Sequence, residues 1–110
     1  EDVVEATFKL ATEAKPGTTW HLSTKKSISI YDLVKKICNL TNTNFEQIVR
    51  IENERLGKDH SYLLDSNAIR DNFAWKDNVD IDDGLKYTIN WVKKNLNYFS
   101  QISWEYKHKK

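Results

Sequence analysis

The chain has 110 residues, the size of a single domain with a modest hydrophobic core. Its 17 Lys and Arg residues nearly balance its 16 Asp and Glu residues, so the net charge favours neither a nucleic-acid nor a membrane partner. No apolar run approaches the roughly 20 residues that span a bilayer, nothing at the start resembles a secretion signal, and the single cysteine cannot form an internal disulfide, which together favour a cytoplasmic protein.

The first half of the chain is expected to contain two helices separated by a strand. Apolar residues recur at three- and four-residue spacing over residues 2–14, which predicts a helix that a Lys-Pro-Gly segment ends. The β-branched and aromatic residues of 18–22 predict a short strand. A second helix is predicted from Ser29, an N-cap candidate with Asp32 three residues later, to about Asn42.

The middle of the chain is expected to consist of turns, loops and two further strands. Residues 45–51 fit neither the helical nor the strand period well, and we interpret them as a turn followed by a strand at 49–52. A polar loop that contains a glycine is predicted at 54–60. Another short strand is predicted at 61–64.

Two helices and a tail are predicted to complete the chain. The first helix is short and is expected to bury Ile69 and Phe73, with Trp75 packing at its end. The last helix is predicted to begin at Asp80, with a second Asp three residues later near its positive end. Residues 97–110 form an aromatic and basic tail whose end is expected to be partly disordered.

This order of elements indicates a partial α/β fold, a small lobe of helices and a few short strands. The strand at 18–22 is preceded by one helix and followed by another, which suits the edge of a larger parallel sheet. We expect the other strands of that sheet to lie outside the chain, which would then expose a face to the missing partner. The chain begins with Glu1 and contains no methionine, so we expect it to be a fragment of a longer protein.

Patterns that would indicate catalysis or metal binding are absent from the sequence. The three glycines are far apart and form no Gly-rich dinucleotide loop, and the histidines and the cysteine lack metal-ligand spacing. No nucleophile-elbow pattern accompanies the Ser, His and Asp residues. Tyr31 and Lys35 spell Tyr-x-x-x-Lys, but they lie on a predicted amphipathic helix, and we interpret the match as coincidence. We therefore expect no catalytic residue, cofactor site or metal site in this chain.

One loop has the composition of an anion site. Arg55, Lys58 and His60 lie beside Gly57, so a planar guanidinium and a mobile ammonium could meet a diphosphate where the backbone can approach closely. Composition alone favours a solvated charged loop, because loops are generally polar.

Four segments, in order along the chain, resemble the extended short-chain dehydrogenases that act on nucleotide sugars. Residues 55–66, with the Ile-Arg and Phe-Ala-Trp-Lys that follow, are similar to the signature Arg-Pro-Gly-x-Asp-x-x-Tyr-x-x-Asp and Leu-Gly-Trp-Lys-Pro of the dTDP- and CDP-glucose 4,6-dehydratase branch. The helix start at 1–6, the Trp-His-Leu segment at 20–22 with residues 29–34, and the Asp-Asp-Gly-Leu-x-x-Thr-Ile-x-Trp of 82–91 resemble further family motifs.

The resemblance implies that residues 1–96 are the C-terminal substrate-binding portion of an NAD-dependent epimerase/dehydratase, followed by the tail 97–110. In such an enzyme, bound NAD transiently oxidises C4 of the sugar in a nucleotide-diphosphate sugar before elimination or epimerisation and hydride return. The NAD-binding Rossmann domain and the catalytic Tyr-x-x-x-Lys pair would lie outside this chain, which is expected to be inactive alone. The family's dimers usually pair through N-terminal helices, so the full-length enzyme is expected to be a homodimer.

The resemblance also implies which residues bind the substrate. Arg55 matches an arginine that contacts the nucleotide diphosphate, Lys58 stands where dehydratases often have a histidine near the nucleotide, and Asp59 keeps an acidic position. Lys26 roughly matches a polar residue that can touch the nucleotide, although Ser-Thr replaces the family's Gly-Gly before it. Ala74 stands where the family has Gly, a departure that affects helix termination rather than chemistry.

Two other classes of function remain open. The chain could be a stand-alone nucleotide-binding or protein-interaction module without catalysis, or a nucleic-acid binder that uses its aromatic and basic tail. The near-neutral charge argues against nucleic acid. The parent reading frame would separate the enzyme from the module, because an enzyme needs the Gly-rich NAD loop and the Tyr-x-x-x-Lys pair upstream.

Overall fold

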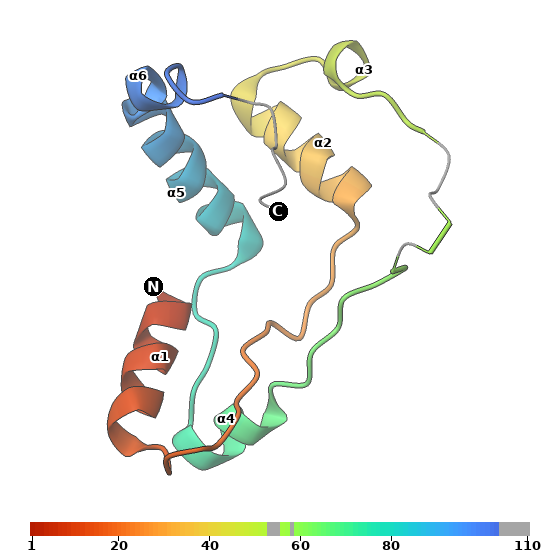
Figure 1. Ribbon diagram of the computed structural model, residues 1–110. Coiled ribbons are helices and arrows are strands. Elements are labelled where there is room, and N and C mark those ends of the chain that lie inside the picture. Colours follow the sequence, from red (N-terminus) through yellow and green to blue (C-terminus); the bar gives the residue numbers. More distant parts are fainter. Residues whose placement is uncertain (53–55, 58, 104–110) are drawn as a thin grey trace. The chain divides into compact units, whose positions relative to one another are not determined.

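The computed structural model describes residues 1–52, 56–57 and 59–103, which fold as two compact units, Glu1–Asp80 and Ile81–Lys110. All regular secondary structure of the described residues is helical (Figure 1). The helices are α1 (Asp2–Glu13), α2 (Ile30–Thr41), α3 (Phe45–Ile48), α4 (Asn67–Phe73), α5 (Ile81–Lys94) and α6 (Leu96–Phe99).

Helix α1 begins and ends where the sequence predicts. Two acidic residues in its first turn, Asp2 and Glu5, suit the positive end of the helix. Its C-cap, Ala14, is already extended, with φ −77° and ψ 148°, just before the proline that cannot continue a helix. Gly17 follows with φ +82°, a conformation that L side chains rarely adopt.

The ends of α2 are set by short polar side chains, as predicted. The Ser29 hydroxyl accepts a hydrogen bond from the backbone N–H of Asp32 at 3.0 Å and donates one to the Asp32 carboxylate at 2.6 Å. At the other end, Asn42 adopts the left-handed conformation, with φ 54°, that often terminates a helix. The turn expected at 45–48 is α3, whose Phe45 ring packs edge-on against Tyr31 of α2 with the centroids 5.1 Å apart.

The core of the first unit joins α1 to α4. Ala6, Ile69 and Trp75 are buried, which confirms the predicted packing of Ile69 and Trp75. Four half-buried apolar residues pack around them: Leu10, Trp20, Leu22 and Phe73. The Trp75 indole donates to the backbone carbonyl of Asp2 at 3.1 Å, which ties the end of α4 to the start of α1.

The second unit contains α5 and α6. Acidic residues occupy the first turn of α5 and lysines its last turn, the arrangement that the helix dipole favours. The rings of Trp91 and Phe99 meet edge-on with centroids 5.5 Å apart, which packs α6 against α5. Helix α6 therefore begins just before the predicted tail, and residues 104–110, where disorder was predicted, lie outside the described residues.

The three predicted strands are wrong, because residues 18–22, 49–52 and 61–64 do not form strands. An extended segment becomes a strand only when its N–H and C=O groups form a ladder with a neighbour. Burial alternates only over residues 20–22, where Trp20 and Leu22 are half-buried and His21 between them is exposed. The described part of the chain supplies no partner strand for this segment.

Candidate functional site

The predicted binding residues fall in two loops of the first unit, and the structure describes only part of them. Lys26 is exposed in the loop between the extended segment and α2, and its backbone N–H donates to the Thr24 hydroxyl at 3.2 Å. Asp59 is also exposed, and its carboxylate accepts a hydrogen bond from the Tyr62 hydroxyl at 2.9 Å. Arg55 and Lys58 lie outside the described residues.

Gly57 lies in a turn between these two cations in the sequence. Its φ of +78° is in the left-handed region, which a glycine adopts without the strain that a Cβ would cause. A Cβ at this position would meet no heavy atom within 4 Å, so the backbone conformation and not crowding explains the glycine. The glycine predicted at the centre of an anion-binding loop is thus in a tight turn, exposed to solvent.

The structure joins the loop of Lys26 to the end of the 55–66 signature. The Ser23 hydroxyl donates to the backbone carbonyl of Leu64 at 2.7 Å. In return, the buried Ser66 hydroxyl donates to the Ser23 carbonyl at 2.9 Å. Figure 1 shows the segment before α2 running beside the segment before α4 at this point.

Arg70 of α4 completes this junction. Its Nη2 donates to the Ser23 carbonyl at 2.8 Å and to the Asp77 carboxylate at 2.7 Å, while its Nε donates to the Ser66 hydroxyl at 3.0 Å. The guanidinium also lies over the Trp75 ring, 4.8 Å from its centroid. Arg70 thus links the start of its own helix to the segments of Ser23 and Asp77 from a largely buried position, with 14% of its side chain exposed.

The carboxylate of Asp77 is held in its charged form by the same junction. Hydrogen bonds from Arg70 and from the Thr24 side chain hold the pKa of Asp77 below its usual value, against the opposing effect of partial burial. Because Thr24 precedes Lys26 by two residues, Asp77 contacts the predicted binding loop as well as α4.

Sequence reasoning assigned no role to Ser23, Ser66, Arg70 or Asp77. The spacing of Ser66 and Arg70, four residues apart at the start of a predicted helix, is a signal for the contact between their side chains. The contacts of both residues with Ser23 cross more than 40 positions of sequence, and no local pattern reports them.

The Tyr-x-x-x-Lys match on α2 makes packing contacts. Lys35 Nζ lies 5.9 Å from the centroid of the Tyr31 ring, which itself packs against Phe45.

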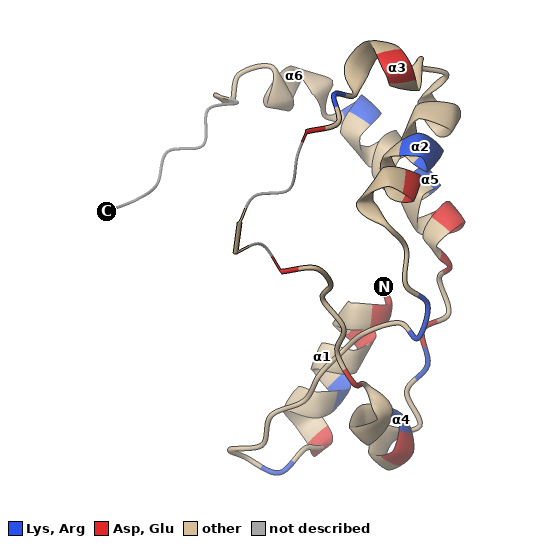
Figure 2. Ribbon diagram, turned by 90° about the vertical axis from the view of Figure 1, so that its right-hand side faces the viewer, with Lys and Arg blue, Asp and Glu red and all other residues tan. Residues whose placement is uncertain are grey.

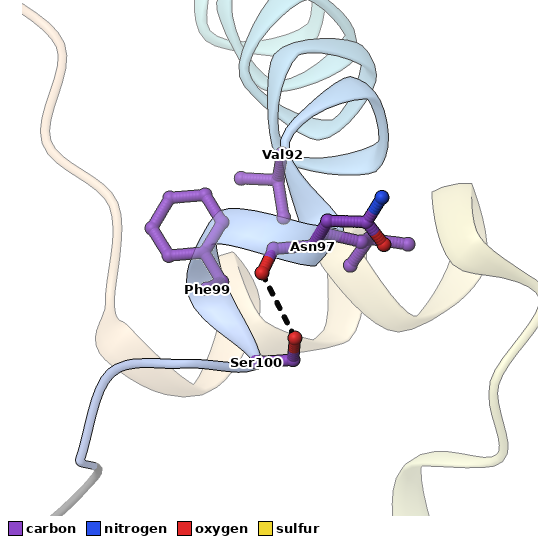
Figure 3. Close-up of a pocket in the computed structure, with 5 residues that line it drawn as sticks. Val92, Asn97, Phe99 and Ser100 are labelled. Carbon is purple, nitrogen blue, oxygen red and sulfur yellow. Dashed lines mark hydrogen bonds between the residues drawn. The ribbon is translucent and has the colours of Figure 1, made fainter.

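An apolar hollow of about 630 Å³ lies in the second unit, lined by Val92, Leu96, Asn97, Phe99 and Ser100 (Figure 3). The Ser100 hydroxyl donates to the Asn97 carbonyl at 2.9 Å, so the polar atoms near the hollow serve the turn after α6. Neither Lys26 nor Asp59, the two predicted substrate-binding residues that the structure describes, lines this hollow.

Acidic and basic residues both occur in α1, α2, α4 and α5 (Figure 2). Among the described residues, no group of three His, Cys, Asp or Glu side chains is placed to share a metal ion. None of the helices in the described ranges is long and apolar enough to cross a membrane.

Known proteins with similar sequences are nucleotide-sugar dehydratases. The dTDP-glucose 4,6-dehydratase of Escherichia coli is 26% identical over 93% of this chain, and that of Mus musculus is 29% identical over 86%. A trifunctional UDP-glucose 4,6-dehydratase/UDP-4-keto-6-deoxy-D-glucose 3,5-epimerase/UDP-4-keto-L-rhamnose-reductase of Arabidopsis thaliana is 28% identical over 94%. No protein-family model matches the chain.

A solved structure agrees with these sequence matches. The Bordetella bronchiseptica enzyme WbmF, crystallised with NAD+ and UDP, is 31% identical and superposes on 92% of this chain with a TM-score of 0.75. The chain is a relative of the nucleotide-sugar 4,6-dehydratases. The resemblance seen in the sequence motifs is confirmed.

The match of this chain to the dehydratases lies in their C-terminal portion. The chain spans 31% of the length of the Escherichia coli dehydratase, 28% of the Mus musculus dehydratase, 15% of the trifunctional Arabidopsis thaliana protein and 30% of WbmF. The remaining length of those proteins has no counterpart in the 110 residues.

Proposed function

We propose that this chain is the C-terminal substrate-binding portion of an NAD-dependent nucleotide-sugar 4,6-dehydratase or epimerase, and that it contributes to binding the nucleotide diphosphate. The observation that carries the proposal is the similarity to dehydratases over more than nine-tenths of the chain. The junction at Ser23 supports it, because this junction brings the loop of Lys26 to the segment that follows Arg55, Lys58 and Asp59.

Each of the four residues has a distinct role in the proposed site. Arg55 offers a planar fork to the diphosphate oxygens, and Lys58 adds a second positive charge beside the tight turn at Gly57. Lys26 extends toward the nucleotide from the neighbouring loop. Asp59, which accepts a hydrogen bond from Tyr62, orders the turn and gives the site an acidic position that can accept hydrogen bonds from the substrate.

The NAD cofactor is assigned to the rest of the full-length enzyme. The WbmF structures contain NAD+ or NADH, but this chain has no Gly-rich loop, since its three glycines are isolated from one another. The catalytic Tyr-x-x-x-Lys pair is assigned to the same N-terminal domain. The chain by itself is therefore proposed to bind substrate without catalysing its conversion.

The N-terminal NAD-binding domain is also the proposed partner of the extended segments. Residues 18–22 have the β-branched and aromatic composition of a strand, with alternating exposure over 20–22, and would complete an α/β fold by joining the edge of that domain's parallel sheet. The substrate-binding portion is proposed to reach residue 96, with 97–110 as the tail. A homodimer in the cytoplasm completes the proposal, with the dimer contact made by the N-terminal helices.

Replacing Arg55 with Ala in the full-length protein tests the binding role. The affinity for UDP or dTDP is expected to fall by about 1.5–3 kcal/mol, the value of a hydrogen bond to a charged group, measured by isothermal titration calorimetry. Arg50→Ala is the matched control, because Arg50 is a nearby exposed arginine that pairs with Glu52 at 3.0 Å. Equal losses in both variants, or no loss in either, would remove Arg55 from the site.

The stand-alone module without catalysis is distinguished by activity. Full-length protein incubated with NAD+ and a nucleotide-diphosphate glucose should form a 4-keto-6-deoxy or C4-epimerised product, detected by mass spectrometry and by NMR of the sugar ring. Nucleotide binding without any such product over a panel of dTDP-, CDP-, UDP- and GDP-sugars would favour the module.

A further inference from the structure

Four hydrogen bonds converge on Ser23 and the residues that bind it. The Ser23 carbonyl accepts from both Ser66 and Arg70, at 2.9 and 2.8 Å, and its hydroxyl donates to Leu64 at 2.7 Å. Arg70 also donates to Ser66 at 3.0 Å. A single guanidinium therefore links the loop of 23–27 to the segment that ends the nucleotide-sugar signature.

The burial and existing hydrogen bonds of these groups argue against direct contact with a ligand. Ser66 is 4% exposed, and Arg70 already directs its described donors at Ser23, Ser66 and Asp77. The charge of Arg70 is largely neutralised by Asp77 at 2.7 Å, so it is a poor anchor for a phosphate. The group is instead built to hold two stretches of main chain together.

We propose that Arg70, oriented by Asp77, is a positioning residue that keeps the loop of Lys26 against the signature segment and so maintains the nucleotide-diphosphate site. This inference rests on the proposed function. Arg70 acts through Ser23 and Ser66 and touches no substrate. Asp77 fixes the guanidinium from one side and, through Thr24, holds the loop from the other.

The geometry requires arginine rather than another cation. The three acceptors, on Ser23, Ser66 and Asp77, are bound by two nitrogens, Nε and Nη2, of one rigid guanidinium plane. A lysine has a single nitrogen on a flexible stem, which can pair with the Asp77 carboxylate but cannot reproduce the fork. Arg70→Lys should therefore keep the ion pair and lose the alignment of the loop.

The test compares Arg70→Met with Lys9→Met in the full-length protein. Lys9 donates to the backbone carbonyl of Phe73 at 2.7 Å, so its loss destabilises the other end of α4 without touching the loop of 23–27. Titration calorimetry with UDP and with dTDP measures affinity, hydrogen exchange measures the order of residues 24–27, and thermal unfolding measures stability.

Arg70→Met is expected to lower the affinity for whichever of UDP and dTDP binds more tightly on the order of tenfold, because a small misplacement of the binding groups is costly. The variant is also expected to speed hydrogen exchange of the backbone amides of residues 24–27. Lys9→Met is expected to lower the melting temperature while leaving the nucleotide affinity and the exchange of residues 24–27 near the wild-type values. Arg70→Lys, the variant to use if Arg70→Met does not fold, should recover stability more fully than affinity.

Three results would overturn the proposal. An Arg70→Met or Arg70→Lys variant that binds the nucleotide as tightly as wild type would overturn the role of Arg70. The proposed nucleotide site would not be affected by that result, because Arg55→Ala tests it separately. Equal loss of affinity in Lys9→Met and the Arg70 variant, at matched loss of stability, would reduce Arg70 to a general structural role. Failure of the wild-type protein to bind any of UDP, dTDP, CDP and GDP would mean that the proposed function itself has failed.

Discussion

Ala74 has a backbone conformation that is unfavourable for a residue with a Cβ atom. It ends α4 in the left-handed region, with φ 50° and ψ 28°, where an L residue other than glycine is strained. The backbone carbonyl of the preceding residue, Phe73, accepts a hydrogen bond from Lys9, and the following residue, Trp75, is buried. These contacts on both sides hold the chain in this turn. The sequence motif predicted a helix end here and identified the missing glycine as a departure.

Ala74→Gly is therefore expected to stabilise the protein by about 0.5–1 kcal/mol, because glycine relieves the strain without removing a packed side chain. Urea denaturation would measure this as a higher midpoint with an unchanged slope. Gly17→Ala provides the opposite control, since φ at Gly17 is +82° with open space around it, and should destabilise by a comparable amount. An unchanged or lower midpoint for Ala74→Gly would contradict the account of this turn.

Asp77 is expected to make stability depend on pH in acid. Its pKa is held below the usual value, mainly by the hydrogen bond from Arg70, so the folded state favours the charged carboxylate more than the unfolded state does. The stabilisation is complete above the unfolded pKa, and it disappears as the pH falls through the lower folded pKa. The difference in unfolding free energy between wild type and Asp77→Asn should be constant from about pH 5 to 7 and should shrink below about pH 4. A difference that grew in acid would contradict this sign.

At the scale of elements, the helices follow from local signals. Ser29 with Asp32 and the terminal Asn42 set the ends of α2 by hydrogen bonds and backbone preferences within a few residues. Such signals are fully contained in a short stretch of sequence, which explains why the predicted bounds of α1 and α2 agree with the observed ones within a residue or two.

Removing the α2 cap should cost a measurable amount of stability. Ser29→Ala leaves the N–H of Asp32 without its acceptor and is expected to destabilise by about 1 kcal/mol. Ser27→Ala, two residues earlier and outside the helix, is the matched control and should have little effect. Chemical denaturation followed by the far-ultraviolet helical signal would compare the two variants, and equal midpoints would show that the cap contributes nothing.

The predicted strands did not form, unlike the predicted helices, because the stability of a strand depends on a distant partner segment. Residues 18–22 have the composition of a strand, yet no ladder forms in the described part of the chain. Propensity reports that a segment suits an extended, half-buried surface, and a sheet additionally needs a second segment at hydrogen-bonding distance.

At the scale of the whole molecule, the first unit exposes apolar side chains along α1 that a helix of a complete domain would normally cover. Val3, Val4 and Phe8 are 60%, 71% and 72% exposed. Apolar side chains exposed together along one helix are typical of a surface that another part of a protein covers, and the chain spans less than a third of the length of the Escherichia coli dehydratase.

In the full-length protein, the backbone amides of the extended segment 18–22 are expected to be protected from hydrogen exchange. Backbone amides of residues 19 and 21 should exchange at least about tenfold more slowly in the full-length protein than in the 110-residue chain, because a sheet ladder would sequester them. Amides within α2 serve as the internal control, since their bonds lie within one helix. Equal exchange at residues 19 and 21 in both proteins would remove the proposed pairing with the NAD-binding domain's sheet.

The sequence alone determined the helix bounds, the buried face of α4 and the relationship to nucleotide-sugar dehydratases, because caps, periodicity and ordered motifs are readable within short windows. The roles of Arg55, Lys58, Asp59 and Lys26 stay predictions that rest on that relationship. Only the tertiary structure decided that Arg70 links Ser23 to Ser66, and that residues 18–22 lack a partner within the described ranges. Both facts depend on which distant segments meet, and that is settled by packing over the whole first unit rather than by any local pattern.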